Sequence, residues 1–144
     1  MQHVFVYGTL LFPEIIEGLT GKSFAAKVAR LEGYERRSLR GADFPALIKN
    51  AASSVTGKIL LNVDDRSFDI LRFFEGDDYQ WIEVEVEVET ANEKLCVCVF
   101  IWIGRAERLE EKDWDRDFFK RNILQGYLKY IIPETVADFT KLFS

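Results

Sequence analysis

Residues 82–103 read IEVEVEVETANEKLCVCVFIWI, and this stretch decides the class of fold. From Ile82 to Glu89 the residues alternate strictly, with isoleucine and valines on one face and glutamates on the other. This period of two predicts a half-buried antiparallel strand. Ala91-Asn92 indicates a turn, and Leu95–Ile103 is expected to return as a strand buried on both faces. The stretch therefore predicts a β-hairpin.

The chain before the hairpin predicts further strands and two helices. A strand is expected at Val4–Tyr7, and one or two strands at Phe24–Leu39 with a turn near Gly33. After a loop at Gly41–Asp43, the segment Phe44–Ile48 is expected to be extended, and another strand is expected at Val55–Val63, where Gly57 marks a bulge or a close backbone approach. One helix is expected from Pro13 to about Leu19 with Gly21 as its stop, and a second from a cap at Asp64 or Asp65 to Phe74, with Gly76 as its stop.

The chain after the hairpin predicts a long amphipathic helix that Asp113 caps and that runs to about Tyr130. Its expected core positions are Trp114, Phe118, Ile123, Tyr127 and Leu128. Pro133 is expected to begin a final short helix. Together these elements predict an α+β fold, a small curved or barrel-like mixed β-sheet of five to seven strands with flanking helices. A single domain over residues 1–144 is expected, because no repeat or linker divides the chain.

Composition excludes several classes of function. The net charge is −5 with scattered basic residues, which argues against nucleic-acid binding. The longest apolar run, Leu95–Ile103, is too short for a membrane-spanning helix, and no signal peptide is visible. Cys96 and Cys98 are interpreted as reduced core residues of a cytoplasmic protein, and a Cys-x-Cys metal site lacks a second group of ligands. We expect no metal and no cofactor, and the sequence leaves the oligomeric state open.

The first candidate site is the turn Tyr7-Gly8-Thr9-Leu10, between a buried strand and a helix. A glycine after a strand lets the backbone turn sharply and present successive N–H groups, and the following helix adds the positive end of its dipole. Such a turn suits a carboxylate or a developing oxyanion. The alternative is that Gly8 only makes a tight turn.

The second candidate is Glu75, which follows two phenylalanines and precedes Asp77 and Asp78. Desolvation, the negative end of the helix dipole and like charges would all raise the pKa of its carboxyl. A carboxyl with a raised pKa can take and return a proton near neutral pH. The alternative is a solvated glutamate at a helix end with an ordinary pKa. Tyr79 and Trp81, just beyond, either wall a pocket or cover the edge of the core.

The order of these motifs resembles the gamma-glutamyl cyclotransferase-like superfamily, in its branch of gamma-glutamylamine cyclotransferases and plant avirulence-induced proteins. The segments that carry the resemblance are Val4–Leu11, Gly33-Tyr34, Phe44–Leu47, Val55-x-Gly57, Leu71-x-x-Phe74-Glu75-Gly76 with Tyr79, and Asp113–Asp115 with Phe118 and Tyr127-Leu128. The Tyr-Gly-Thr-Leu turn and the Phe-Glu-Gly block are its specific parts.

The resemblance implies that Glu75 is the catalytic acid/base and that Tyr7, Gly8, Thr9 and Leu10 bind a small gamma-glutamyl substrate. The implied reaction releases 5-oxoproline and a free amine by intramolecular aminolysis. Trp81 departs from the family, which often has arginine at that position, and this puts the preferred substrate in doubt. Two other functions stay open: a non-catalytic module that binds a small ligand, and a relative that removes a gamma-glutamyl group from a larger amine.

Overall fold

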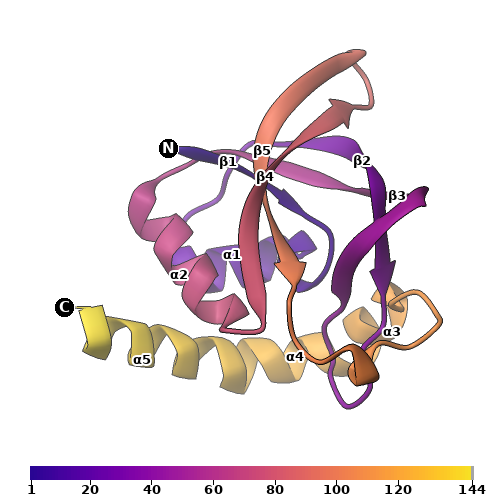
Figure 1. The fold of residues 1–144 in the computed structure, drawn as a ribbon. Coiled ribbons are helices and arrows are strands. Elements are labelled where there is room, and N and C mark those ends of the chain that lie inside the picture. The colour runs from indigo at the N-terminus through magenta and orange to yellow at the C-terminus, as the bar shows by residue number, and fades with distance from the viewer. Residues whose placement is uncertain (144) are drawn as a thin grey trace.

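The computed structural model describes residues 1–143, whose strands close into a barrel (Figure 1). The strands are β1 (Gln2–Val6), β2 (Ala26–Arg37), β3 (Ala46–Val63), β4 (Tyr79–Val88) and β5 (Glu93–Trp102). They follow one another around the barrel in the order β1-β3-β2-β4-β5. Neighbouring strands are antiparallel except β1 and β5, which pair in parallel through Val4 and Cys98. The expected barrel-like mixed sheet with flanking helices is confirmed.

The hairpin β4–β5 forms as the alternation predicts. Val86 and Val88 are buried inside the barrel, and Asn92 takes a left-handed conformation in the turn, with φ at 49°. The expectation that Leu95–Ile103 is buried on both faces is wrong near the tip of the hairpin, where Cys96 is exposed. Helices cover the outer face of β5 only nearer its end, where Cys98 is buried.

Strand β3 is longer than the sequence predicted. The range Phe24–Leu39, expected to form one or two strands, holds the single strand β2, and the register between β2 and β3 shifts beside Gly33, whose φ of 83° only glycine adopts freely. The two predicted segments at Phe44–Ile48 and Val55–Val63 belong to the single strand β3. Gly57 marks a close approach, since a Cβ there would overlap the carbonyl oxygen of Val6.

The helices are α1 (Pro13–Thr20), α2 (Asp65–Glu75) and a continuous helical arm made of α3 (Arg116–Phe118), α4 (Leu124–Gly126) and α5 (Ile132–Phe143). Asp64 caps α2, and its carboxylate accepts the N–H of Ser67 at 3.2 Å. The predicted cap at Asp113 is wrong. Asp115 caps the arm by accepting the N–H of Phe118 at 2.9 Å, while Asp113 pairs with Arg36.

Two π-helical turns, Phe119–Ile123 and Tyr127–Ile131, join the pieces of the arm. Each wide turn adds a residue to the helical period and so shifts which side chains face the core. The predicted core position Phe118 is accordingly 52% exposed, whereas Phe119 and Leu124 are buried. Pro133 is the second residue of α5, within one residue of the predicted start, and α5 continues directly from the π-helical turn before it.

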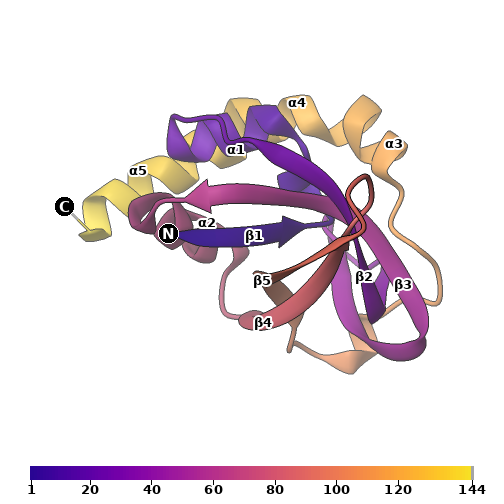
Figure 2. The same ribbon diagram turned by 90° about the horizontal axis from the view of Figure 1, so that it is seen from above.

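Two apolar clusters hold the molecule together. One fills the barrel, and the other lies between the barrel and the helices, which gather on one side of it (Figure 2). Because residues alternate along β1, Phe5 and Tyr7 belong to the interior and Val4 and Val6 to the helical side. Within residues 1–143, no helix combines the length and the apolar character needed to cross a membrane.

Candidate active site

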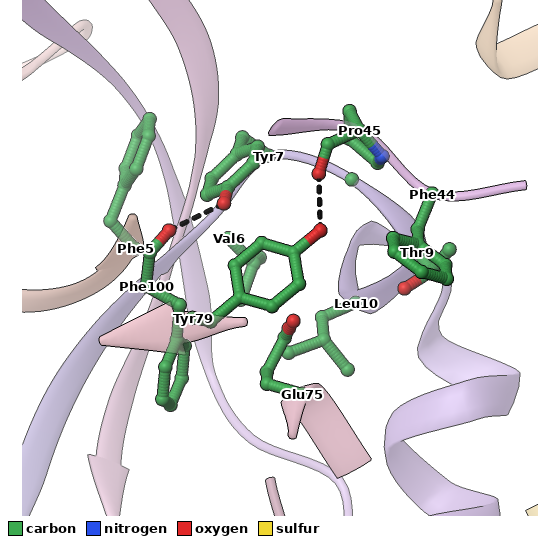
Figure 3. Close-up of a pocket in the computed structure, with 11 residues that line it drawn as sticks. Phe5, Val6, Tyr7, Thr9, Leu10, Phe44, Pro45, Glu75, Tyr79 and Phe100 are labelled. Atoms are coloured by element: carbon green, nitrogen blue, oxygen red, sulfur yellow. Dashed lines mark hydrogen bonds between the residues drawn. The ribbon is translucent and has the colours of Figure 1, made fainter. Parts of the chain in front are cut away.

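A pocket opens where the end of β1, the end of α2 and the start of β4 meet (Figure 3). Its walls are formed by Phe5, Val6, Tyr7, Gly8, Thr9, Leu10, Phe44, Pro45, Glu75, Tyr79 and Phe100. The enclosed space is small, about 20 Å³, which is room for about one water molecule. A ligand larger than a water molecule therefore fits only if part of the wall moves. Phe44 is the residue we expect to move, because it lines the pocket and its side chain is partly exposed.

The turn after β1 forms one wall of the pocket. A 3₁₀ turn covers Thr9–Leu11, with the Leu11 N–H donating to the Gly8 carbonyl at 2.9 Å. The N–H groups of Thr9 and Leu10 precede this first bond, so the turn itself gives them no partner. A Cβ at Gly8 would lie 2.7 Å from the ring of Pro45. The turn thus places at the pocket wall two residues whose amides it does not itself pair, and Gly8 lets Pro45 pack directly on the backbone.

Glu75 lies opposite this turn, as the last residue of α2. Gly76 ends the helix with φ at 81°, as the sequence predicted. The Glu75 side chain is partly buried among aromatic rings, and this burial raises the pKa of its carboxyl to about 8. Burial alone causes the shift, whereas the neighbouring Asp77 and Asp78 are exposed and add nothing to it. The carboxyl is therefore mostly protonated at neutral pH.

Two tyrosines frame the carboxyl and are fixed by backbone carbonyls. The hydroxyl of Tyr7 donates to the carbonyl of Phe100, and that of Tyr79 donates to the carbonyl of Pro45 at 2.6 Å (Figure 3). Burial raises the pKa of both hydroxyls above the usual tyrosine value, and the nearby Glu75 raises them further. Both tyrosines therefore stay neutral and serve as rigid walls.

Known proteins resemble in sequence the part of this chain that forms the pocket. The family model described as "Gamma-glutamyl cyclotransferase, AIG2-like" matches residues 4–116, which include the turn, Glu75 and Tyr79. The chain belongs to this family. Among curated relatives, Protein AIG2 C of Arabidopsis thaliana is 29% identical over 114 residues, which cover 79% of this chain and 69% of that protein. AIG2-like protein D of the same plant is 28% identical over 130 residues, covering 90% and 86%.

Solved structures share the fold. A solution structure from Arabidopsis thaliana superposes with a TM-score of 0.70 at 25% identity, and covers 90% of this chain and 87% of its own. A structure titled "Gamma-glutamyl cyclotransferase" gives a TM-score of 0.58 at 16% identity, with coverage of 90% and 86%. At this identity the second likeness concerns the fold alone.

Six of the seven site residues expected from the sequence line this one pocket: Tyr7, Gly8, Thr9, Leu10, Glu75 and Tyr79. Trp81 is not part of its wall. The Trp81 ring packs edge-on against Phe68 with centroids 5.8 Å apart, on the side of β4 that faces the helices. In a family that often has arginine at this position, Trp81 thus covers the core, which is the alternative that the sequence left open.

Sequence reasoning missed five lining residues: Phe44, Pro45, Phe5, Val6 and Phe100. The first two lie in a segment that carried the family resemblance, and that resemblance was the signal for them. Phe100 faces the pocket because it pairs with Trp81 in the hairpin and shares a face of β5 with Trp102. That pairing does not follow from the predicted two-residue turn Ala91-Asn92, which would pair Trp81 with Trp102; the observed turn is longer, since Val88 pairs with Glu93. The sequence therefore held no clear signal for Phe100.

The raised pKa of Glu75 makes stability depend on pH with a definite sign. The unfolded chain releases this proton at about pH 4.3, but the folded chain keeps it to about pH 8. Because the folded state binds more protons in between, the free energy of unfolding should fall as pH rises through this window. We expect Glu75→Gln to remove this pH-dependent loss of stability. Urea denaturation should then give the variant a higher free energy of unfolding than wild type at pH 9, but not at pH 4. Parallel pH dependence in both proteins would contradict this.

Proposed function

We propose that this protein is a gamma-glutamyl cyclotransferase-type enzyme that releases 5-oxoproline and a free amine from a gamma-glutamyl amine or peptide. The observation that carries the proposal is that the Glu75 carboxyl and the amide-bearing turn Tyr7–Leu10 line one pocket. Family membership and the fold of the structural relatives support it. The proposal includes a single domain over residues 1–144 and a cytoplasmic location, in keeping with the free thiols of Cys96 and Cys98.

The reaction closes a ring within the substrate. The α-nitrogen attacks the γ-carbonyl carbon, a new C–N bond forms, and the bond from that carbon to the departing nitrogen breaks. The α-nitrogen gives up two protons as it changes from ammonium to lactam N–H, and the departing nitrogen gains two as it leaves as an ammonium ion. No water is consumed. Holding the tethered groups in line supplies much of the rate acceleration.

Glu75 serves both proton transfers in this scheme. As a carboxylate it accepts a proton from the α-nitrogen, and as a carboxylic acid it donates one to the departing nitrogen. A pKa of about 8 lies close to that of an α-amino group, so the transfer from the α-nitrogen is nearly balanced in free energy. The amides of Gly8, Thr9 and Leu10 would stabilise negative charge on the substrate carboxylate or on the tetrahedral oxyanion.

The test is to incubate the purified protein with gamma-glutamyl amines, gamma-glutamyl dipeptides and glutathione, and to quantify products by mass spectrometry. Glutathione belongs in the panel because a yeast protein of this fold is titled a cyclotransferase specific to glutathione. We expect 5-oxoproline and amine in equal amounts from at least one compound. Binding without turnover would make the protein a non-catalytic module, and free glutamate would indicate hydrolysis. Either result would overturn the proposal.

The pKa of Glu75 also sets the pH dependence of turnover. Below about pH 8 the free enzyme lacks the carboxylate form, so kcat/KM should rise about tenfold per pH unit and then level off near pH 8. Above the pKa of the substrate amine, also about 8, kcat/KM should fall again. Initial rates from about pH 5.5 to 9.5 check this profile. A rising limb that ends near pH 4 to 5 would show that an ordinary carboxyl controls the reaction.

A further inference from the structure

Arg36, near the end of β2, is held by three groups. Its Nε and Nη2 donate to the two carboxylate oxygens of Asp113 at 2.8 and 3.0 Å, and its Nη1 donates to the carbonyl oxygen of Tyr7 at 2.7 Å. The guanidinium carbon lies 5.5 Å from the centroid of the Trp114 ring. The side chain is only 18% exposed. A planar, forked group with these contacts has essentially one orientation.

The contact with Tyr7 bears on the pocket through the geometry of the peptide bond. The carbonyl of Tyr7 and the N–H of Gly8 belong to the same planar trans peptide, so they point in opposite directions. A donor that fixes the carbonyl therefore also fixes the direction of the N–H. The fixed carbonyl points toward Arg36, which does not line the pocket, so the N–H of Gly8, a residue of the pocket wall, points the opposite way.

The charge of Arg36 adds a second effect to this orientation. A cation that donates to a carbonyl polarises the whole peptide unit and makes its N–H a stronger donor. The strengthened donor is the N–H of Gly8, next to the amides of Thr9 and Leu10, which receive no partner within the 3₁₀ turn. Asp113 supports this arrangement because its bidentate pair with Arg36 prevents the guanidinium from rotating away from Tyr7.

We infer that Arg36 is a positioning residue for the reaction, acting through the Tyr7–Gly8 peptide. It aims and polarises the Gly8 N–H that holds negative charge on the gamma-glutamyl substrate or on the tetrahedral oxyanion, and Asp113 braces it. This inference rests on the proposed function. It assigns no proton transfer to Arg36, so the pH dependence set by Glu75 should be unaffected by its replacement.

The test compares Arg36→Gln and Arg36→Lys with the matched control Arg37→Gln. Arg37 is the next residue of the same strand, and its Nε also donates to a backbone carbonyl, that of Glu110, at 2.7 Å. We expect kcat/KM of Arg36→Gln to fall about 10- to 100-fold, less than the loss of a whole oxyanion donor. Arg36→Lys should recover part of this loss, Arg37→Gln should stay within about twofold of wild type, and the break near pH 8 should remain in all three.

An activity-independent measurement separates this inference from the proposed function. The probe is 5-oxoproline, titrated into ¹⁵N-labelled wild type and variants while the amide resonance of Gly8 is followed. We expect a shifted Gly8 resonance in free Arg36→Gln and a weaker response to 5-oxoproline than in wild type or Arg37→Gln. If wild type releases no 5-oxoproline from any substrate, the proposed function fails. The Gly8 resonance still tests Arg36 in that case: a shift in Arg36→Gln supports its hold on the Tyr7–Gly8 peptide, and an unchanged resonance rejects it.

Two outcomes would overturn the positioning role while leaving the function intact. One is wild-type kcat/KM in folded Arg36→Gln, and the other is a Gly8 resonance identical to wild type. Should Arg36→Gln not fold, Arg36→Lys and Asp113→Asn take its place. For these milder variants we expect a several-fold fall in kcat/KM with the melting temperature near that of Arg37→Gln. Normal turnover in both would reject the inference.

Discussion

Replacing Glu75 by glutamine should lower kcat by about 10²–10⁴, the usual contribution of a positioned acid/base group. Glutamine has nearly the same shape as a protonated glutamate, which is the form that burial favours in the folded protein. The fold and the walls of the pocket should therefore stay as they are, and KM should change little. The measurement is 5-oxoproline release at saturating substrate, with circular dichroism as the check on folding.

The matched control for this substitution is Asp78→Asn. Asp78 lies three residues further along the chain and is exposed, so the same chemical change there should leave kcat within about twofold. Glu75→Asp should also be impaired, because a shorter side chain draws the carboxyl away from the reacting nitrogen atoms. Near-normal turnover of folded Glu75→Gln would remove Glu75 from the mechanism.

Gly8→Ala should reduce kcat/KM by about 10² or more and also destabilise the protein. The new Cβ would lie 2.7 Å from Cγ and Cδ of Pro45, closer than carbon atoms approach without displacement. Moving Pro45 disturbs the carbonyl that accepts the hydroxyl of Tyr79, and moving the turn misaligns its amides. Overpacking of this kind costs about 1–3 kcal/mol in the free energy of unfolding.

Gly126→Ala provides the opposite control for the same chemical change. Gly126 lies in the helical arm, and a Cβ there would meet no atom within 4 Å. Alanine stabilises a helix interior by about 0.5–1 kcal/mol relative to glycine, so this variant should be slightly more stable and fully active. Urea denaturation and kcat/KM measured on both variants test the pair. If Gly8→Ala kept wild-type stability and turnover, the close packing of the turn on Pro45 would be unimportant.

Local patterns explain why much of the fold could be predicted. The alternation from Ile82 to Glu89 determines which face of β4 enters the barrel, and the Ala91-Asn92 turn determines its partner, β5. Both signals are strictly local. The helical arm was predicted less well, because π-helical turns leave no clear sequence mark and displace the core from Phe118 to Phe119. The merging of two segments into β3 likewise depends on pairing with β2 far away in sequence.

The candidate site divides in the same way. Glu75 and the Tyr7–Leu10 turn carry motifs, so the sequence alone singles them out. Trp81 was expected at the pocket because it shares a face of β4 with Tyr79. However, α2 covers that face, and the Trp81 ring packs against Phe68 of α2 at the edge of the core. Arg36 carries no motif at all, and only the barrel brings it to the carbonyl of Tyr7.

The most direct test of the account is a carbon-13 titration of the Glu75 carboxyl, assigned by the loss of its signal in Glu75→Gln. A carboxyl turned into the aromatic pocket should titrate with a midpoint near pH 8. A midpoint near 4.3, the value of a glutamate in water, would place the group in solvent and contradict its role as the acid/base of this site.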